Sequence, residues 1–392
     1  MHKSRFLVAC AVAAAVILWA PFVSQVRSWI RTQFPGQFVL IVGSAIAIVI
    51  VGALLATLLR IRERRAIRYG ALVAAVALGV GYSLRYADGR PDIDVVERFH
   101  FVEFGIVTLL FYRAWRPLND WSVFVLPYLA GLLVGTLEEW FQWFIPVRVG
   151  EMRDIFLNSA AIGSGLLFSV ALDPPASFAP RLFPASRRAV ARFAAVVVLA
   201  IAGFFHSVHL GHEIHDPEIG TFRSRHTAER LAELSSARVA RWRTDPPPVT
   251  IPRLSREDQF LTEGIEHVRR RNELWDAGDA AGAWRENRIL EKYYAPVVDV
   301  RSYHAKDGSR WPEEQRHNAE LAGTLSAEAS VQAAGGTEVP PYVSQSNPAP
   351  IYTWPVWLFW CVTLAVVALL LGLSAWFTRP SAARTSPHPS AR

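Results

Sequence analysis

Residues 135–158 read GTLEEWFQWFIPVRVGEMRDIFLN, and they join two apolar runs of the chain through a short charged connection. The first run covers residues 121–144 and the second covers residues 154–172. Each run has about the 20 residues that a helix needs to cross a bilayer. A connection this short forces the two helices to lie antiparallel. The stretch therefore predicts a helical hairpin in a membrane, with its polar residues near the turn.

Similar runs recur along the chain of 392 residues, of which 52% are hydrophobic. The further candidates for spans are 6–26, 37–59, 66–85, 95–112, 189–210 and 354–377. The first of them follows Lys3 and Arg5 without a clear cleavage signal, so we interpret it as a retained helix rather than a signal peptide. The predicted fold class is all-α: a polytopic helical membrane protein with about eight transmembrane helices.

Arginine and lysine are distributed unevenly between the connections. With eight spans, the connections 60–68, 113–120 and 173–192 share one side with both termini, and they carry most of the basic residues of the short loops. Because excess Arg and Lys marks the cytoplasmic side, we expect both termini inside and residues 211–353 outside. The net charge of +7 is then a topology signal, and nucleic acid is not an expected partner.

Five segments follow from these boundaries. Residues 1–59 are N-terminal spans, 60–172 a membrane domain, 173–210 a linker with the seventh span, 211–353 a small helical extracytoplasmic domain, and 354–392 the last span with a cytoplasmic tail. In the external domain, 227–243 reads as a helix, 255–294 as a helical hairpin broken at Gly278, and 333–350 as a flexible tether. Cys10 and Cys361 lie in spans, so neither a disulfide framework nor a cysteine metal site is expected.

Polar side chains gather at one depth on three predicted helices. The fourth span brings His100 and Glu103, three residues apart on one face. The hairpin brings Glu138, Glu139, Gln142, Arg148, Asp154 and Asn158. Ionisable groups inside a membrane are normally turned inward and functional, which predicts a polar pocket at the outer leaflet. A purely structural role in helix packing is the alternative.

Four histidines at intervals of three, His206, His209, His212 and His215, suggest a metal site at the end of the seventh span. On a continuous helix this spacing drifts by about 60° per step, so the first and last would face opposite ways. The stretch also lacks the HExxH spacing of a zinc site. We therefore expect interfacial histidines and no metal or cofactor; His206, His209 and His212 are the weak metal candidates.

The polar residues carry a resemblance. The pair His100 and Glu103, the Glu138-Glu139-x-x-Gln142 block, Pro146-x-Arg148 and Asp154-x-x-x-Asn158 resemble the VanZ-like family of bacterial membrane proteins. The match covers roughly residues 60–172. Three positions depart from the family pattern: Glu138 stands where Asp is usual, Phe104 where Tyr is common, and Ala161 where a glycine follows the Asn.

The resemblance implies a role in the bacterial cell envelope at the plasma (inner) membrane, in a family named for an accessory factor of glycopeptide (teicoplanin) resistance. The first hypothesis is a non-enzymatic protein in which Glu138, Gln142, Arg148, Asp154 and Asn158 bind a lipid headgroup or a lipid-linked cell-wall intermediate. The external domain would then engage an envelope protein or polymer.

The second hypothesis is a membrane-embedded hydrolase or transferase that acts on a lipid-linked substrate. His100, Glu103 or Glu139 would supply the acid or base. The sequence offers no Ser or Cys nucleophile motif and no phosphate loop, which favours the first hypothesis.

Overall fold

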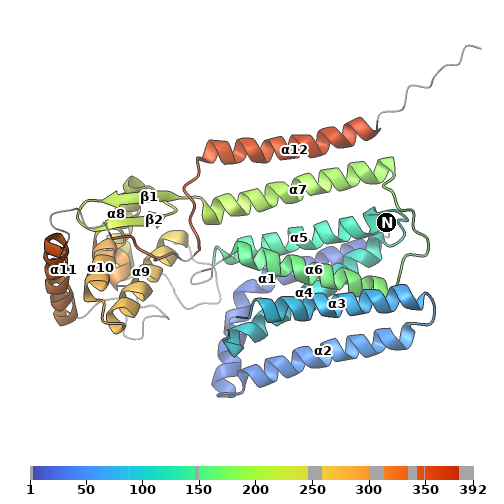
Figure 1. Cartoon of the computed structure of the whole chain (residues 1–392), viewed down its shortest axis with the longest axis horizontal. Helices are drawn as coiled ribbons and strands as arrows, with labels where there is room; N and C mark the ends of the chain where they lie inside the picture. The colour runs from blue at the N-terminus through green and yellow to red at the C-terminus, as the bar shows by residue number, and fades with distance from the viewer. Residues whose placement is uncertain are drawn as a thin grey trace, which may run out of the picture.

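A bundle of long helices dominates the molecule (Figure 1). The computed structural model describes residues 3–87, 89–145, 150–245, 258–299, 313–333, 342–347 and 349–378. The bundle helices are α1 (Lys3–Gln33), α2 (Phe38–Arg60), α3 (Arg65–Arg85), α4 (Pro91–Trp115), α5 (Ser122–Gln142), α6 (Met152–Leu172), α7 (Pro184–His209) and α12 (Val356–Thr378). They match the eight apolar runs of the sequence to within a few residues, except that α1 continues past Pro21 to Gln33.

Among the described residues, seven helices are long and apolar enough to cross a membrane. The eighth, α4, is 25 residues long but carries several charged side chains in its first half. It nevertheless lies in the middle of the bundle, packed against α6, α5, α1 and α2. Its neighbours bury some of its polar groups, such as Asp94, which is how charge is accommodated among membrane helices. The protein is thus a mostly helical, multi-pass membrane protein.

Small residues bring α4, α5 and α6 close together. A Cβ on Gly165 of α6 would lie 2.7 Å from the Cα of Gly105 on α4, and one on Gly131 of α5 would lie 2.9 Å from the side chain of Ile162. Helices without side chains at the crossing point approach closely, and dispersion contacts then hold them together in lipid. This packing places the polar ends of three helices next to one another.

An inserted domain (residues 211–353) lies between α7 and α12 in the sequence. It contains α8 (Ala228–Thr244), α9 (Asp258–Asp276), α10 (Ala280–Tyr293), a 3-10 turn (Ala295–Asp299) and α11 (Glu313–Ala333). The helix predicted at 227–243 and the hairpin broken at Gly278, whose φ is 84°, are both present. Residues 255–257, at the start of the predicted hairpin, lie outside the described residues.

The domain departs from the all-α expectation by a two-stranded antiparallel hairpin, β1 (His212–Asp216) and β2 (Gly220–Ser224). The turn is set by Asp216, whose Oδ1 accepts the backbone N–H of Glu218 at 3.0 Å and of Ile219 at 3.1 Å. Gly220 then takes φ 120°, which favours glycine. A hydrophobic core that includes Phe222, from β2, packs against the helices of the domain.

The segment that returns the chain to the membrane, residues 342–347 and 349–355, is not a free tether in its described part. Val343 forms a parallel bridge with Thr221 of β2, and Tyr352 forms one with Leu210 after α7. The side chains of Tyr342 and Ser344 both donate to Glu286 on α10. Sequence alone did not indicate this packing, because every contact is to a residue far away in the chain.

The inserted domain sits on one end of the bundle, and the first turn of α1 lies toward the other end (Figure 1). Gln259 of α9 donates its side-chain N–H to the carbonyl oxygen of Trp143, which follows α5, at 2.8 Å. Arg225 donates to the carbonyl oxygen of His206 on α7 at 2.9 Å. The domain therefore covers the end of the bundle at which α5 ends and α6 begins, where the sequence concentrates its polar residues.

Candidate functional site

The last turns of α5 carry three buried polar side chains. Glu138, Glu139 and Gln142 expose 7%, 0% and 4% of their surfaces. Residues three and four apart are neighbours on a helix, and the Gln142 amide bridges both carboxylates. Its Nε2 donates to Oε1 of Glu138 at 2.5 Å and to Oε1 of Glu139 at 3.1 Å. The acidic pair predicted as part of the site is thus one hydrogen-bonded cluster.

Asn158 of α6 faces this part of α5 and is fully buried. A Cβ on Gly135 would lie 3.1 Å from both Cβ and Nδ2 of Asn158, so only glycine leaves room for the amide here. Neither the Oδ1 nor the Nδ2 atom has a hydrogen-bond partner among the described residues. A buried amide without partners costs about 1–3 kcal/mol. Such a group requires an explanation, and an absent ligand or water is one.

His100 and Glu103 of α4 complete the arrangement. The His100 Nδ1 atom lies 3.2 Å from the carbonyl oxygen of Glu97 and 3.3 Å from that of Val96. Since both partners can only accept, a neutral ring donates from Nδ1 and keeps Nε2 as an acceptor. The Glu103 carboxylate interacts electrostatically with His100 and with Glu138 of α5. The fourth helix therefore brings its polar face to the same cluster.

Two further predicted site residues have different outcomes. Asp154 lies in the first turn of α6, one turn before Asn158, and interacts electrostatically with Tyr82 of α3. Arg148 lies outside the described residues, as does the rest of 146–149. The cluster of α4, α5 and α6, which we call the carboxylate cluster, consists of His100, Glu103, Glu138, Glu139, Gln142 and Asn158.

An open groove of about 860 Å³ runs along the other side of α6. Its walls come from α3, α5, α6, α7 and the return segment, and its lining is mostly apolar. Its lining includes Tyr82, Tyr86, Tyr128, Arg153, Ser159, Ala160 and His209. Tyr128 and Ser159 share a hydrogen bond of 2.5 Å between their hydroxyl oxygens. The groove thus has an apolar body with polar groups at its rim and on its floor.

Arg153 lines the groove together with the acidic Glu151. Its guanidinium forms an ion pair of 2.7 Å with Glu97 of α4 and a weak hydrogen bond of 3.4 Å with the carbonyl oxygen of Tyr86. It therefore links α6 to α3 and α4 beside the groove. Its position next to Asp154, at the start of a predicted span, was the signal available in the sequence. The groove itself left none, because its walls are far apart in the chain.

The four histidines do not lie on one continuous helix. The helix that would carry all four histidines ends at His209, and His212 and His215 lie on strand β1. His206 accepts from the indole N–H of Trp360 on α12 at 3.2 Å. His209 Nδ1 lies 2.7 Å from the carbonyl oxygen of Pro350. Within the part of the chain that the structure describes, no group of three metal-ligating side chains occurs.

The helical drift argument for these histidines was therefore wrong beyond His209, because the chain leaves the helix there to form the β-hairpin. In the structure His206 and His209 instead tie α7 to α12 and to the return segment.

No family model, no curated protein and no solved structure matches this chain.

Proposed function

We propose that the chain is a VanZ-like integral membrane protein of the bacterial cell envelope that binds a lipid headgroup or a lipid-linked cell-wall intermediate at the outer leaflet. In this proposal both termini are cytoplasmic, and the inserted domain lies outside the inner membrane, where it engages an envelope protein or polymer. The basic connections at the opposite end of the bundle support this orientation.

The groove is the observation that carries the proposal. Ligand sites are concave and mostly apolar, with a few polar groups that fix orientation. An open groove of about 860 Å³ along α6 fits this description. An acyl or polyprenyl chain would lie along Ala160, and the headgroup would lie at the rim beside Arg153. A guanidinium suits phosphate and carboxylate oxygens.

The carboxylate cluster supplies the polar counterpart of the groove. Helix α6 carries both, with Asn158 in the cluster and Ser159 in the groove. Amide and carboxylate groups with unused hydrogen-bonding capacity, such as Asn158 and the Oε2 atom of Glu138, can receive the hydroxyl or amide groups of a lipid-linked sugar or peptide.

Native mass spectrometry of the purified full-length protein tests the lipid proposal. Ala160→Trp fills the groove, and Gly52→Trp on α2 is the matched control because nothing lies within 4 Å of a Cβ there. With added polyprenyl phosphate, we expect the wild type and Gly52→Trp to carry the lipid and Ala160→Trp to lose it. Equal lipid occupancy in all three proteins would exclude the groove as the site.

The orientation has an independent test. A periplasmic reporter fused at Gly278, the exposed turn between α9 and α10, should be active only if the inserted domain lies outside. Activity of a cytoplasmic reporter at the same position would overturn the outward-facing proposal.

One observation favours an enzyme as the second candidate function. The backbone contacts of His100 orient its ring and leave Nε2 as an acceptor beside Glu103, as a general base requires. A hydrolase or transferase would lose turnover of a lipid-linked substrate in His100→Asn and Glu139→Gln while keeping the lipid bound. Loss of folded protein in both variants would instead indicate a packing role.

A further inference from the structure

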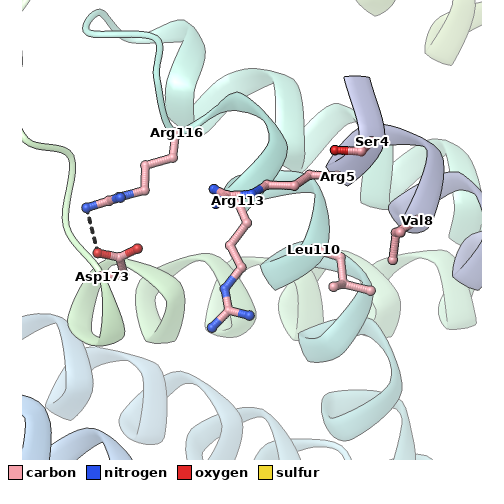
Figure 2. A pocket seen from close by; sticks show the side chains of 7 residues that line it. All are labelled: Ser4, Arg5, Val8, Leu110, Arg113, Arg116 and Asp173. Carbon is pink, nitrogen blue, oxygen red and sulfur yellow. Dashed lines mark ion pairs between the residues drawn. The ribbon is translucent and has the colours of Figure 1, made fainter. Parts of the chain in front are cut away.

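A second cavity, of about 440 Å³, lies at the end of the bundle away from the inserted domain. Figure 2 shows its lining residues, which come from the first turns of α1, the last turns of α4 and the residue after α6. Three of them are arginines, Arg5, Arg113 and Arg116, and one is acidic, Asp173. Neither the carboxylate cluster nor the groove includes any of these residues.

The positive charge of this cavity is only partly neutralised. Arg116 forms an ion pair of 2.6 Å with Asp173 and is further held by the carbonyl oxygen of Pro174 (Figure 2). Arg5 and Arg113 form no ion pair with any described residue. Arg113 is half-buried, so part of its hydration is lost without compensation from an acidic neighbour. Two guanidinium groups are thus available to an anion.

Two features identify a phosphate as the fitting anion. A guanidinium presents several N–H groups in one plane, which match the oxygen atoms of a phosphate. The cavity also lies at the start of α1, and the positive end of a helix dipole favours negative charge. The dipole alone would make no site; here it adds to two arginines that lack an acidic partner.

The apolar wall of the cavity indicates where the phosphate comes from. Val8 of α1 is 53% exposed, and Leu110 of α4 lines the same cavity. Val8 lies on α1, one of the candidate membrane spans, and Leu110 is half-buried beside it. A free phosphate ion would leave this wall unused, whereas a lipid would place its phosphate between the arginines and its acyl chain against Val8.

We propose that this cavity binds the phosphate of an anionic membrane lipid, with Arg5 and Arg113 as its ligands and Arg116 held in place by Asp173. The site is separate from the groove of the proposed function. It lies at the end where loop charge predicts the cytoplasmic leaflet, which is rich in such lipids in many membranes. A bound lipid here would fix α1 against α4.

The test uses the full-length protein in detergent, titrated with dioleoyl-phosphatidylglycerol and followed by native mass spectrometry. Each of Arg5→Gln and Arg113→Gln should weaken binding about fivefold, and the double variant about 25-fold, since one basic residue near a membrane contributes about a fivefold factor. Arg62→Gln is the matched control, because this exposed arginine lies in a basic connection but does not line the cavity. We expect it to change binding less than twofold.

Several outcomes would overturn the proposal. One is binding of the lipid by the double variant as tightly as by the wild type. Another is a loss of affinity in the control as large as in Arg113→Gln, which would indicate a diffuse charge effect. A thermal shift with inorganic phosphate equal to that with the lipid would identify a free-phosphate site instead. Should Arg113→Gln fail to fold, Arg5→Glu reverses an exposed charge without touching the bundle core and must weaken binding about 25-fold, since the charge changes by two units.

The two lipid sites are distinguished by their variants. Ala160→Trp should keep the phosphatidylglycerol of this cavity, and the double arginine variant should keep the polyprenyl phosphate of the groove. Failure of one proposal therefore leaves the other testable.

Discussion

Two amides in the carboxylate cluster are expected to respond to the same substitution with opposite signs. Gln142 donates to two carboxylates at 2.5 and 3.1 Å, whereas the amide of Asn158 has no partner among the described residues. Leucine is close to isosteric with asparagine and similar in length to the glutamine stem. We therefore expect Asn158→Leu to stabilise the protein and Gln142→Leu to destabilise it.

The magnitudes follow from the hydrogen bonds. Removing a buried amide that makes no hydrogen bond recovers its desolvation penalty of about 1–3 kcal/mol. Removing the Gln142 amide loses its hydrogen bonds to charged groups, which are worth about 1.5–3 kcal/mol each. It also leaves two buried carboxylates that repel each other without the donor that they share. The difference between the two variants in the free energy of unfolding should therefore exceed about 3 kcal/mol.

The assay is chemical denaturation in mixed micelles, followed by tryptophan fluorescence, with bound lipid measured in parallel. Asn158→Leu should raise the free energy of unfolding while lowering lipid retention, the pattern of a group kept for a ligand rather than for stability. If it instead lowers the free energy of unfolding as Gln142→Leu does, the amide has a partner in the folded protein. Asn158 would then be a packing residue, and its assignment to the site would be refuted.

Three further outcomes are expected. Glu286→Gln should lower the free energy of unfolding by about 3–5 kcal/mol in equilibrium unfolding, because it removes the charge from a buried acceptor of three hydrogen bonds. The control Glu218→Gln, in an exposed ion pair, should lower it by under about 1 kcal/mol. Burial raises the pKa of Asp216, but its hydrogen bonds outweigh this effect and lower the pKa to about 2. The roughly 2 kcal/mol that the ionised carboxylate contributes to the free energy of unfolding should be complete above pH 4 and lost between pH 4 and 2. In Asp216→Asn this part of the pH dependence of unfolding should vanish. Gly165→Ala should lower the thermal midpoint and reduce the free energy of unfolding by about 1–3 kcal/mol, because its Cβ would meet the Gly105 backbone. The control Gly70→Ala lies in open space and should be neutral or stabilising. Equal effects of the two substitutions would contradict the close crossing of α4 and α6.

The membrane helices could be predicted from the sequence because one energy term dominates them. A run of apolar residues of sufficient length has no better solution in a bilayer than a helix, so the boundaries of α2, α3 and α6 lie within two residues of the predicted runs. The depth of the polar residues followed from the helical rise alone. This is why Glu103 and Glu138, on different helices, could be expected to lie near each other.

The features that could not be predicted depend on contacts between distant segments. The groove needs α3, α7 and the return segment at once, and no local pattern encodes that combination. No strand was predicted over residues 212–224, because the pairing of β1 with β2 was not considered. The uncompensated charge of Arg113 likewise depends on which acidic side chains the fold brings near it.

The return segment also imposes an order on biosynthesis. Glu286 is synthesised before Tyr342 and Ser344, two of its three hydrogen-bond donors. Until then the domain contains a buried carboxylate held by His267 alone among its described side-chain donors. A chain that ended before residue 342 would lack two of the donors to this carboxylate. Complete folding of the domain therefore requires synthesis as far as the return segment, just before α12.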